Sequence, residues 1–314
     1  MTRLAIVTGA DAPDLTSDGQ RLAAALEERG VSTEATRWDD PSVEWERFDA
    51  ALVRSCWEYY RDLDWFERLC EDLEAADVTV RNPPGVIRWN VHKSYLRDLA
   101  RAGVEVVPTE YVGPDEDREL AAILEVRGWD EAVVKPPVGT SSAGVWRTSR
   151  ETAAADQTRF EAPFDAARRV GDSASGGRGA TLPHRGALVQ EFYPEVAAGE
   201  RSLVFFEGRF SHAWESQRAE DGVGVEPTAD PVGAFLPGEG TRATAADVLR
   251  AAADVLDVAP SAFTYARVDG VHRDGAFHLL ELELVEPYLN LGARENAVEA
   301  FADSVTRTVR VDTG

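Results

Sequence analysis

The spacing of apolar residues over the first 80 positions predicts a small open α/β unit. Residues 50–53 are continuously apolar, as expected of a parallel strand covered on both faces. In chain order the pattern predicts a strand at 4–7, a helix capped by Asp18 and stopped by Gly30, strands at 31–37 and 50–53, a helix at 64–76 and a strand at 78–80. That order indicates an open parallel sheet with helices on its faces.

The pattern changes after the break at 82–84, where an asparagine precedes two prolines. The elements expected beyond it are a helix capped by Asn90 and ended by Gly103, strands at 104–107, 132–135, 145–147, 187–192, 202–206 and 209–214 with a tight turn at Glu207-Gly208, a helix at 244–256, a hairpin of 264–271 with 277–285, and a helix at 294–309. Residues 172–186 have a loop-like composition, so a surface excursion is expected there. No repeat or coiled-coil pattern occurs in the sequence.

The hairpin near the end of the chain carries the strongest chemical signal. Glu281 and Glu283 alternate with leucines, so both carboxylates project from one face of the strand while the leucines enter the core. A three-residue loop at 274–276 would bring Asp269 opposite Glu281, whereas a two-residue loop would turn Asp269 to the other face. Three carboxylates on one face repel one another unless a cation lies among them, and an all-oxygen set suits Mg²⁺ or Mn²⁺. The alternative is a solvated sheet face of an acidic protein.

Lysine is almost absent from the chain. Of the 33 basic residues, only Lys93 and Lys135 are lysines. Lys135 ends a predicted strand and precedes a loop rich in glycine and serine at 139–144, where backbone N–H groups and a lysine charge would cradle phosphates. The loop is not a P-loop, because it lacks the G-x-x-x-x-G-K-[ST] pattern. Lys93 offers a second charge from the first turn of its predicted helix. The alternative is that both lysines are solvated surface residues.

Two weaker signals are compatible with binding. The segment 188–194 ends in a proline-marked bend that would offer free backbone groups to a purine edge, although an ordinary strand end has the same composition. Arg54 follows a predicted parallel strand, at the edge where open α/β sheets bind ligands, and would hold a substrate carboxylate there. The alternative for Arg54 is a structural ion pair. The five histidines have no metal-binding spacing, and His212 is expected to be a packing residue.

Composition and charge narrow the classes of function. The 314 residues carry 33 Lys+Arg and 56 Asp+Glu, a net charge of −23, which disfavours nucleic acid and anionic membranes as partners because both would repel the chain. No apolar run is long enough to span a membrane, and two cysteines are too few for a disulfide scaffold. A cytoplasmic protein of two or three domains is therefore expected. High acidity with little lysine is typical of a halophilic protein in a salty cytoplasm, or of a GC-rich genome that favours arginine codons.

The order of these features resembles the ATP-grasp superfamily over about residues 86–314. The shared order is Lys93, then Lys135 with its glycine loop, then the strand 189–192, then Asp269, then Glu281-Leu282-Glu283. The sequence segments 38–41, 53–59, 88–90, 93–96, 199–206 and 281–287 are similar to those of the group that includes the cycloserine-forming cyclo-ligase. That group is more distantly related to glutathione synthetase and to the ribosomal-protein glutamate ligases. The resemblance implies an open parallel α/β domain at 1–85, a first ATP-grasp part at 86–185 and a C-terminal subdomain with the metal site at 186–314.

The resemblance also implies roles for individual residues. The residues that would contact ATP are Lys93, Lys135, the loop with Gly139, Ser141, Ser142 and Gly144, the adenine hinge of Gln190, Glu191 and Tyr193, and Glu200 at the ribose. Asp269, Glu281 and Glu283 would bind two Mg²⁺ ions. Arg267 or Arg218 would contact the γ-phosphate, and Arg201 or Arg267 would stabilise the tetrahedral oxyanion. Many ATP-grasp enzymes have Glu-x-Asn where this chain has Glu-x-Glu, and Asn290 would replace that amide only if the chain bends back.

The implied activity is an ATP- and Mg²⁺-dependent ligase that forms an acylphosphate on a small amino-acid-like substrate. An amine, or a second nucleophile within the same molecule, would then displace phosphate. The implied partners are small-molecule carboxylates and amines, with a homodimer as a possible assembly. Two alternatives stay open: a non-catalytic ATP-binding regulatory protein on the same fold, and a phosphotransferase that stops at the phosphorylated substrate.

Overall fold

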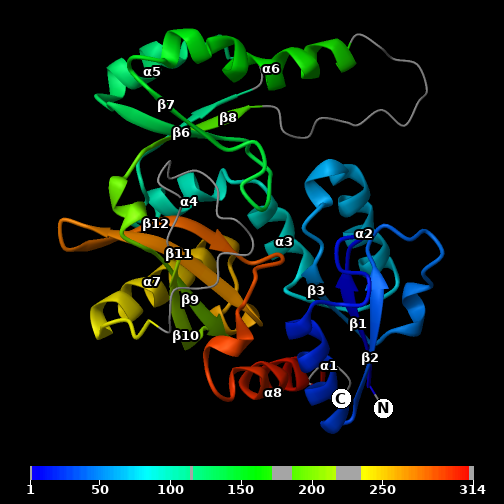
Figure 1. Ribbon diagram of the computed structural model, residues 1–314. Coiled ribbons are helices and arrows are strands. Elements are labelled where there is room, and N and C mark those ends of the chain that lie inside the picture. The colour runs from blue at the N-terminus through cyan, green and yellow to red at the C-terminus, as the bar shows by residue number, and fades with distance from the viewer. Residues whose placement is uncertain (1, 114–115, 172–185, 217–234, 311–314) are drawn as a thin grey trace.

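The N-terminal part of the chain forms a parallel four-stranded sheet (Figure 1). The computed structural model describes residues 2–113, 116–171, 186–216 and 235–310. The sheet has the order β2-β1-β3-β4 and alternates with two helices: β1 Thr2–Thr8, α1 Ser17–Glu28, β2 Val31–Arg37, β3 Ala50–Ser55, α2 Leu63–Ala75 and β4 Thr79–Arg81. The predicted open parallel α/β unit is therefore confirmed.

The two faces of this sheet bury alternate residues of each strand. Ala5 and Val7 of β1 pack with α2, while Leu4 and Ile6 pack on the opposite side with α1. That second side is also covered by α8, Ala297–Arg310, whose Phe301 belongs to the same core cluster (Figure 1). The last helix of the chain thus completes the core of its first sheet.

The predicted cap of α1 is wrong by two residues. Thr16 is the N-cap, and its hydroxyl accepts a hydrogen bond of 3.1 Å from the backbone N–H of Gly19. Asp18 lies inside the first turn, and its carboxylate accepts from the backbone N–H of Leu291 at 2.8 Å. A carboxylate that can cap a helix can equally accept a hydrogen bond from a distant loop. Local residue spacing does not distinguish between these two roles.

The chain after β4 forms two short helices where one was predicted. α3 spans Pro84–Val91 and α4 spans Tyr95–Arg101, so Asn90 lies in the last turn of α3 and Lys93 lies between the helices. The backbone N–H of Lys93 donates to the carbonyl of Pro137 at 2.7 Å instead of continuing a helix. The predicted strand at 104–107 is also wrong. That segment makes one bridge, Val106 to Leu279, and the strand begins after Pro108.

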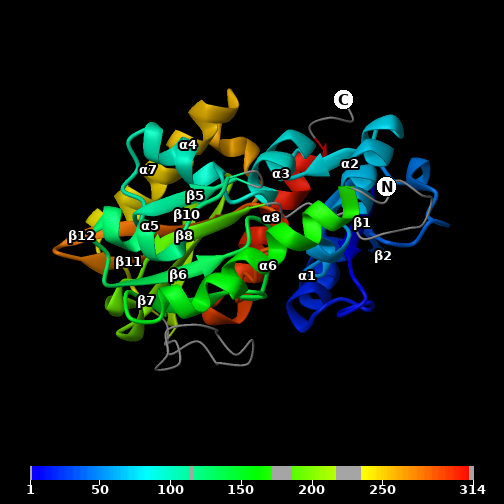
Figure 2. The same cartoon turned by 90° about the horizontal axis from the view of Figure 1, so that it is seen from above.

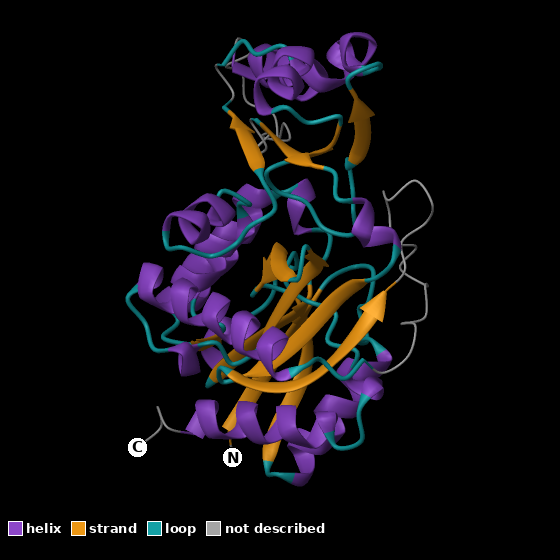
Figure 3. Cartoon of the chain, turned by 90° about the vertical axis from the view of Figure 1, so that its left-hand side faces the viewer, coloured by secondary structure: helices purple, strands orange, loops and turns teal. Residues whose placement is uncertain are grey.

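A second, antiparallel sheet has the order β5-β8-β6-β7 and stands apart from the rest of the fold (Figure 3). Its strands are β5 Thr109–Val112, β6 Glu131–Lys135, β7 Trp146–Ser149 and β8 Ala187–Glu191, and its helices are α5 Leu120–Arg127 and α6 Ala153–Gly171. Both helices lie on its outer face (Figures 1 and 2). Residues 172–185 of the predicted surface excursion lie outside the described residues.

The third sheet, also antiparallel, has the order β10-β9-β11-β12. Its elements are β9 Glu200–Phe206, β10 Arg209–Ser216, α7 Glu239–Leu256, β11 Ala266–Arg273 and β12 Ala276–Glu283, and short 3-10 turns lie at Trp45–Arg47, Tyr59–Arg61, Pro194–Ala197, Pro260–Ala262 and Leu291–Ala293. α4 and α7 pack on one face of this sheet, and the predicted turn at Glu207-Gly208 is confirmed by the left-handed backbone of both residues. No helix in the described part of the chain is long and apolar enough to cross a membrane.

The β11–β12 hairpin reaches the predicted register by an unpredicted route. Its loop has two residues, because Arg273 pairs with Ala276, and such a loop alone would turn Asp269 away from Glu281. A bulge at Leu280 shifts the register between Asp269 and Gly270, so that Asp269 lies opposite Glu281 and Arg267 opposite Glu283. A Cβ atom on Gly270 would lie 2.4 Å from the carbonyl oxygen of His278, so glycine permits the close approach. Two departures from the predicted geometry therefore cancel.

Candidate active site

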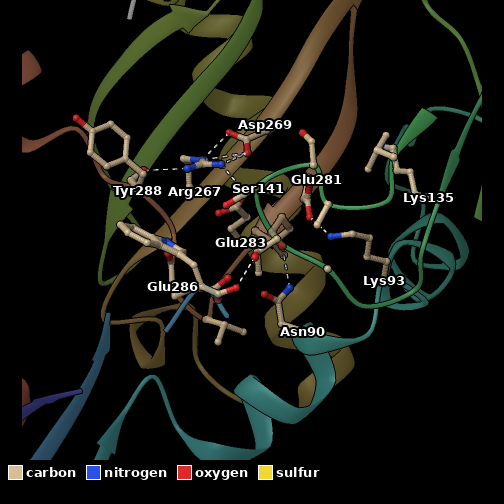
Figure 4. Close-up of a pocket in the computed structure, with 18 of the residues that line it drawn as sticks. Asn90, Lys93, Lys135, Ser141, Arg267, Asp269, Glu281, Glu283, Glu286 and Tyr288 are labelled. Atoms are coloured by element: carbon tan, nitrogen blue, oxygen red, sulfur yellow. Dashed lines mark hydrogen bonds and ion pairs between the residues drawn. The ribbon is translucent and has the colours of Figure 1, made fainter. Parts of the chain in front are cut away.

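A cavity of about 480 Å³ opens between the three sheets. The acidic face of the β11–β12 hairpin forms one wall, and the glycine loop after β6 forms another (Figure 4). Most of the predicted site residues line it: Lys93, Lys135, Gly139, Ser141, Ser142, Glu200, Arg267, Asp269, Glu281 and Glu283. The sequence therefore anticipated that these distant segments meet at one site.

Partly buried ion pairs hold the acidic face together. The Arg267 guanidinium donates to both oxygens of Asp269, from Nε at 2.9 and 3.0 Å and from Nη2 at 2.8 Å, and it also pairs with Glu283. Its Nη1 donates to the carbonyl of Tyr288 at 2.9 Å. The Lys93 ammonium pairs with the Glu281 carboxylate (Figure 4). Two cations thus occupy the space among the three acids.

Side chains substitute for a neighbouring strand along the free edge of β12. The Asn90 amide donates to the carbonyl of Leu282 at 2.8 Å and accepts from the N–H of Leu284 at 2.7 Å. The Tyr95 hydroxyl accepts from the N–H of Leu282 at 3.0 Å, and the Asn82 amide donates to the carbonyl of Leu284 at 2.8 Å. Every outward backbone group of this stretch is satisfied, which fixes the strand that carries Glu281 and Glu283.

Burial dominates the titration of the acids in this wall. Desolvation raises the pKa of Asp269, which is 1% exposed, despite the opposing charge of Arg267. Desolvation likewise raises the pKa of Glu283 well above its ordinary value. Glu281 is also desolvated, but the charges of Lys93 and Lys135 outweigh burial and lower its pKa. Burial raises the pKa of Glu286 to about 8. In three of these four acids, burial therefore favours the protonated form.

The predicted metal ligands share a face but do not form a closed cage. Within the described ranges, no group of three or more His, Cys, Asp or Glu side chains is gathered closely enough to hold a metal ion. Arg267 separates Asp269 from Glu283, and Lys93 lies on Glu281. The metal role of the three acids stays a prediction.

The glycine loop adopts an unusual backbone and contacts the N-terminal sheet. Ser141 and Ser142 have φ angles of 50° and 56°, and Gly144 has 74°, all in the left-handed region. The Thr140 hydroxyl donates to the backbone carbonyl of Trp57, which follows β3. The loop thereby closes one side of the cavity against the first sheet, although Gly144 itself does not line the cavity.

The predicted adenine hinge lies behind Lys135. The Lys135 ammonium donates to Gln190 Oε1 at 2.7 Å, and Gln190 donates in turn to the Thr109 hydroxyl at 3.0 Å. Glu191 faces Arg273, 3.5 Å from its Nη1, and the Arg273 guanidinium lies 4.1 Å from the Tyr193 ring centroid. None of these three hinge residues lines the cavity.

Three more predicted residues, Arg201, Arg54 and Asn290, lie outside the cavity lining. Arg201 pairs with Glu215 at 3.2 Å. Arg54 donates from Nη2 to the carbonyl of Pro287 at 2.8 Å, and its guanidinium lies 4.9 Å from the Tyr265 ring centroid. Asn290 begins a 3-10 turn, with its Oδ1 3.4 Å from the Tyr288 hydroxyl. Arg218 lies outside the described residues.

Sequence reasoning missed the part of the cavity formed by Thr16, Trp57, Tyr59, Trp214, Glu286 and Tyr288. Three of these residues lie in segments that carried the family resemblance, Trp57 and Tyr59 in 53–59 and Glu286 in 281–287. The indole N–H of Trp57 donates to the backbone carbonyl of Glu286 at 3.2 Å, so the two segments are in direct contact. That resemblance was the only available signal, because no periodicity links positions so far apart.

Comparisons with known proteins agree with this geometry. Residues 4–82 match the family model of the D-cycloserine synthetase DcsG N-terminal domain. The chain is 33% identical over 317 residues to the cycloserine biosynthesis protein DcsG of Streptomyces lavendulae, covering 98% of this chain and 99% of that protein.

The fold is also similar to solved structures. The crystal structure of D-cycloserine synthetase DcsG superposes with a TM-score of 0.84 at 30% identity, covering 98% of this chain and all of that one. D-alanine–D-alanine ligase from Bacillus anthracis, complexed with ATP, has a TM-score of 0.67 at 16% identity, with both chains covered in full, which shows the shared fold. The family model, the sequence identity over nearly the whole chain and the structural superposition all point to DcsG. This chain therefore belongs to the DcsG family of ATP-grasp ligases.

Proposed function

We propose that the protein is an ATP- and Mg²⁺-dependent ligase that activates a carboxylate as an acylphosphate and joins it to an amine-type nucleophile. The observation that carries the proposal is that the only two lysines of the chain lie at the same cavity as the acidic face of β11 and β12. In a chain whose other basic residues are all arginines, this placement favours a role for a compact charge on a flexible stem.

The nucleotide would lie between the second and third sheets. Lys93, Lys135 and the N–H groups of the loop at 139–144 would bind its phosphates, Gln190, Glu191 and Tyr193 its adenine, and Glu200 its ribose. The left-handed serines support the loop's role, because such turns direct successive N–H groups to one side, where anions bind.

The chemistry of the cavity wall suits a divalent cation. In the described residues, five carboxylates but only three basic side chains line the cavity. The side chains of β11 and β12 that could bind a metal ion there are all carboxylates. Asp269, Glu281 and Glu283 would hold Mg²⁺, which when bound neutralises the phosphate oxygens of ATP. Arg267 and Lys93 would then release part of their present contacts with these acids.

The reaction would run in two balanced steps. A carboxylate oxygen of the substrate attacks the γ-phosphorus and the bond to the β-phosphate oxygen breaks, which yields the acylphosphate and ADP. The nucleophile then attacks the acyl carbon, the carbon–oxygen bond to phosphate breaks, and the nucleophile loses its proton as inorganic phosphate leaves. Arg267 or Arg218 would face the γ-phosphate, and Arg201 or Arg267 would stabilise the developing negative oxygen. The loop held to Trp57 by Thr140 would exclude water, which would otherwise hydrolyse the acylphosphate.

The name of the relative suggests the kind of bond that forms. Opening the cyclic amide of cycloserine gives a serine whose side-chain oxygen carries an amino group. A carboxylate and its nucleophile then belong to one molecule, and the second step closes a ring. We infer an intramolecular ligation of this kind for the present chain, on a small amino-acid-like substrate.

The test is substrate-dependent ADP formation at high KCl, with O-aminoserine and a pool of amino acids and dicarboxylates. We expect ADP only with Mg²⁺ and a suitable carboxylate, and a hydroxamate when hydroxylamine is added. Lys93→Met should abolish turnover, whereas Arg101→Met, which changes an exposed basic residue of α4, should not. ADP binding without any substrate-dependent ADP formation would favour a regulator, and a phosphorylated product without a hydroxamate would favour a phosphotransferase.

A further inference from the structure

One acid in the cavity differs from its neighbours. The side chain of Glu286 is 8% exposed, at the cavity wall three residues beyond β12. Asp269 and Glu283 are paired with Arg267, and Glu281 with Lys93, but within the described residues the Glu286 carboxylate makes no hydrogen bond or ion pair. An unpaired buried carboxylate is costly, so its retention at a cavity wall points to a ligand cation.

The surroundings of Glu286 are aromatic. Trp57, Tyr59 and Tyr288 line the same cavity, and the Trp57 indole is fixed by its bond to the Glu286 carbonyl. Figure 4 shows Glu286 and Tyr288 to one side of Glu283 and the two lysines to the other. The phosphate-binding charges and this acid thus occupy different parts of one cavity. Aromatic rings attract ammonium groups through their negative faces, and an ammonium group bound beside Glu286 would favour the charged form of its carboxyl group.

We propose that Glu286, with the rings of Trp57, Tyr59 and Tyr288, binds the α-ammonium group of an amino-acid substrate and so decides which carboxylates are activated. The inference rests on the proposed function, which supplies the reacting carboxylate. In an α-amino acid the ammonium and carboxyl groups are separated by one carbon. A bound ammonium therefore holds the carboxylate near the acidic face of the hairpin. Glu286 is a specificity-determining residue that makes no contact with the transferred phosphoryl group.

The test compares amino acids with partners that lack the amino group. Alanine with lactate and serine with glycerate, each amino acid in both enantiomers, and O-aminoserine are assayed for ADP formation, and their binding in the presence of ADP and Mg²⁺ is measured by calorimetry. For Glu286→Gln we expect KM or Kd for the amino acids to rise about 10- to 100-fold, as for loss of one charged hydrogen bond. Binding of the desamino acids should change less than threefold, and kcat should be largely kept.

Two controls separate the possible failures. Glu295→Gln alters an exposed acid nine residues further along the chain and should leave every constant unchanged, while Glu286→Asp should recover part of the amino-acid affinity. Equal losses for amino and desamino acids, or a raised Mg²⁺ requirement in place of a raised KM, would overturn the role of Glu286. Absence of ADP binding in the wild type would instead overturn the proposed function itself.

Discussion

The amide of Asn90 offers a direct test of how the acidic strand is held. Asn90→Leu keeps the approximate shape of the side chain but removes both hydrogen bonds to β12. The two groups left without partners, the carbonyl of Leu282 and the N–H of Leu284, belong to residues that are 1% and 0% exposed. Each unsatisfied buried backbone group costs about 1–3 kcal/mol, so the free energy of unfolding should fall by roughly 2–6 kcal/mol.

Urea unfolding at pH 7, followed by tryptophan fluorescence, measures this loss. Asn90→Asp is the informative companion, because its carboxylate accepts from Leu284 but cannot donate to Leu282. Protonation restores a donor, so the Asp variant should approach the wild type as the pH falls below its raised carboxyl pKa, while the Leu variant should not. A Leu variant within 0.5 kcal/mol of the wild type would show that the amide does not anchor the strand.

Three further outcomes follow from the same region. Gly270→Ala should cost about 1–3 kcal/mol, because its Cβ would meet the His278 carbonyl at 2.4 Å, whereas Gly240→Ala, in helix α7 with open space around it, should not destabilise the protein in the same urea titration. Arg267→Met should cost about 3–5 kcal/mol by leaving two acids unpaired, and MgCl₂ should restore more stability to it than to the wild type in thermal unfolding. For Glu286, the pKa is about 8 in the fold against 4.5 as its ordinary value, so its contribution is present below pH 4.5 and lost as the pH rises through 8.

The Glu286 outcome is measured as a difference between two pH profiles of unfolding. Glu286→Gln removes the group, so its stability relative to the wild type should rise between pH 5 and pH 9, by roughly 3–5 kcal/mol in total. Parallel profiles would contradict the assignment. For Arg267→Met, an equal response of variant and wild type to MgCl₂ would argue against a cation among these acids, and a Gly270→Ala protein as stable as the Gly240→Ala control would show that the bulge has room for a side chain.

Local sequence patterns predicted the helices and strands well, but they did not predict the tertiary contacts that hold these elements to one another. The alternation of acids and leucines was sufficient to place Glu281 and Glu283 on one face, because strand geometry alone decides that. The bulge was hidden, since Leu279 and Leu280 are both apolar and the pattern does not show that Leu280 is an extra residue. Asn90 was misjudged for a related reason: the same amide serves a helix cap or a strand edge, and only the tertiary fold selects between them.

The candidate site divides in the same way. Lysine scarcity singled out Lys93 and Lys135, and the family resemblance placed them with the acids of the hairpin. Glu286 escaped notice because its distinction is the lack of a partner, a property that exists only once the surrounding chain has folded. The same holds for Arg267, whose contacts with Asp269 and Glu283 depend on the register that the bulge sets.

The position of α8 has a consequence for synthesis of the protein. One face of the first sheet shares its core with Phe301 and Val305, so that face stays partly bare until the ribosome has added the residues of α8. The N-terminal sheet therefore cannot complete its core while it emerges from the ribosome. The nascent protein exposes an apolar surface there until α8 has been made.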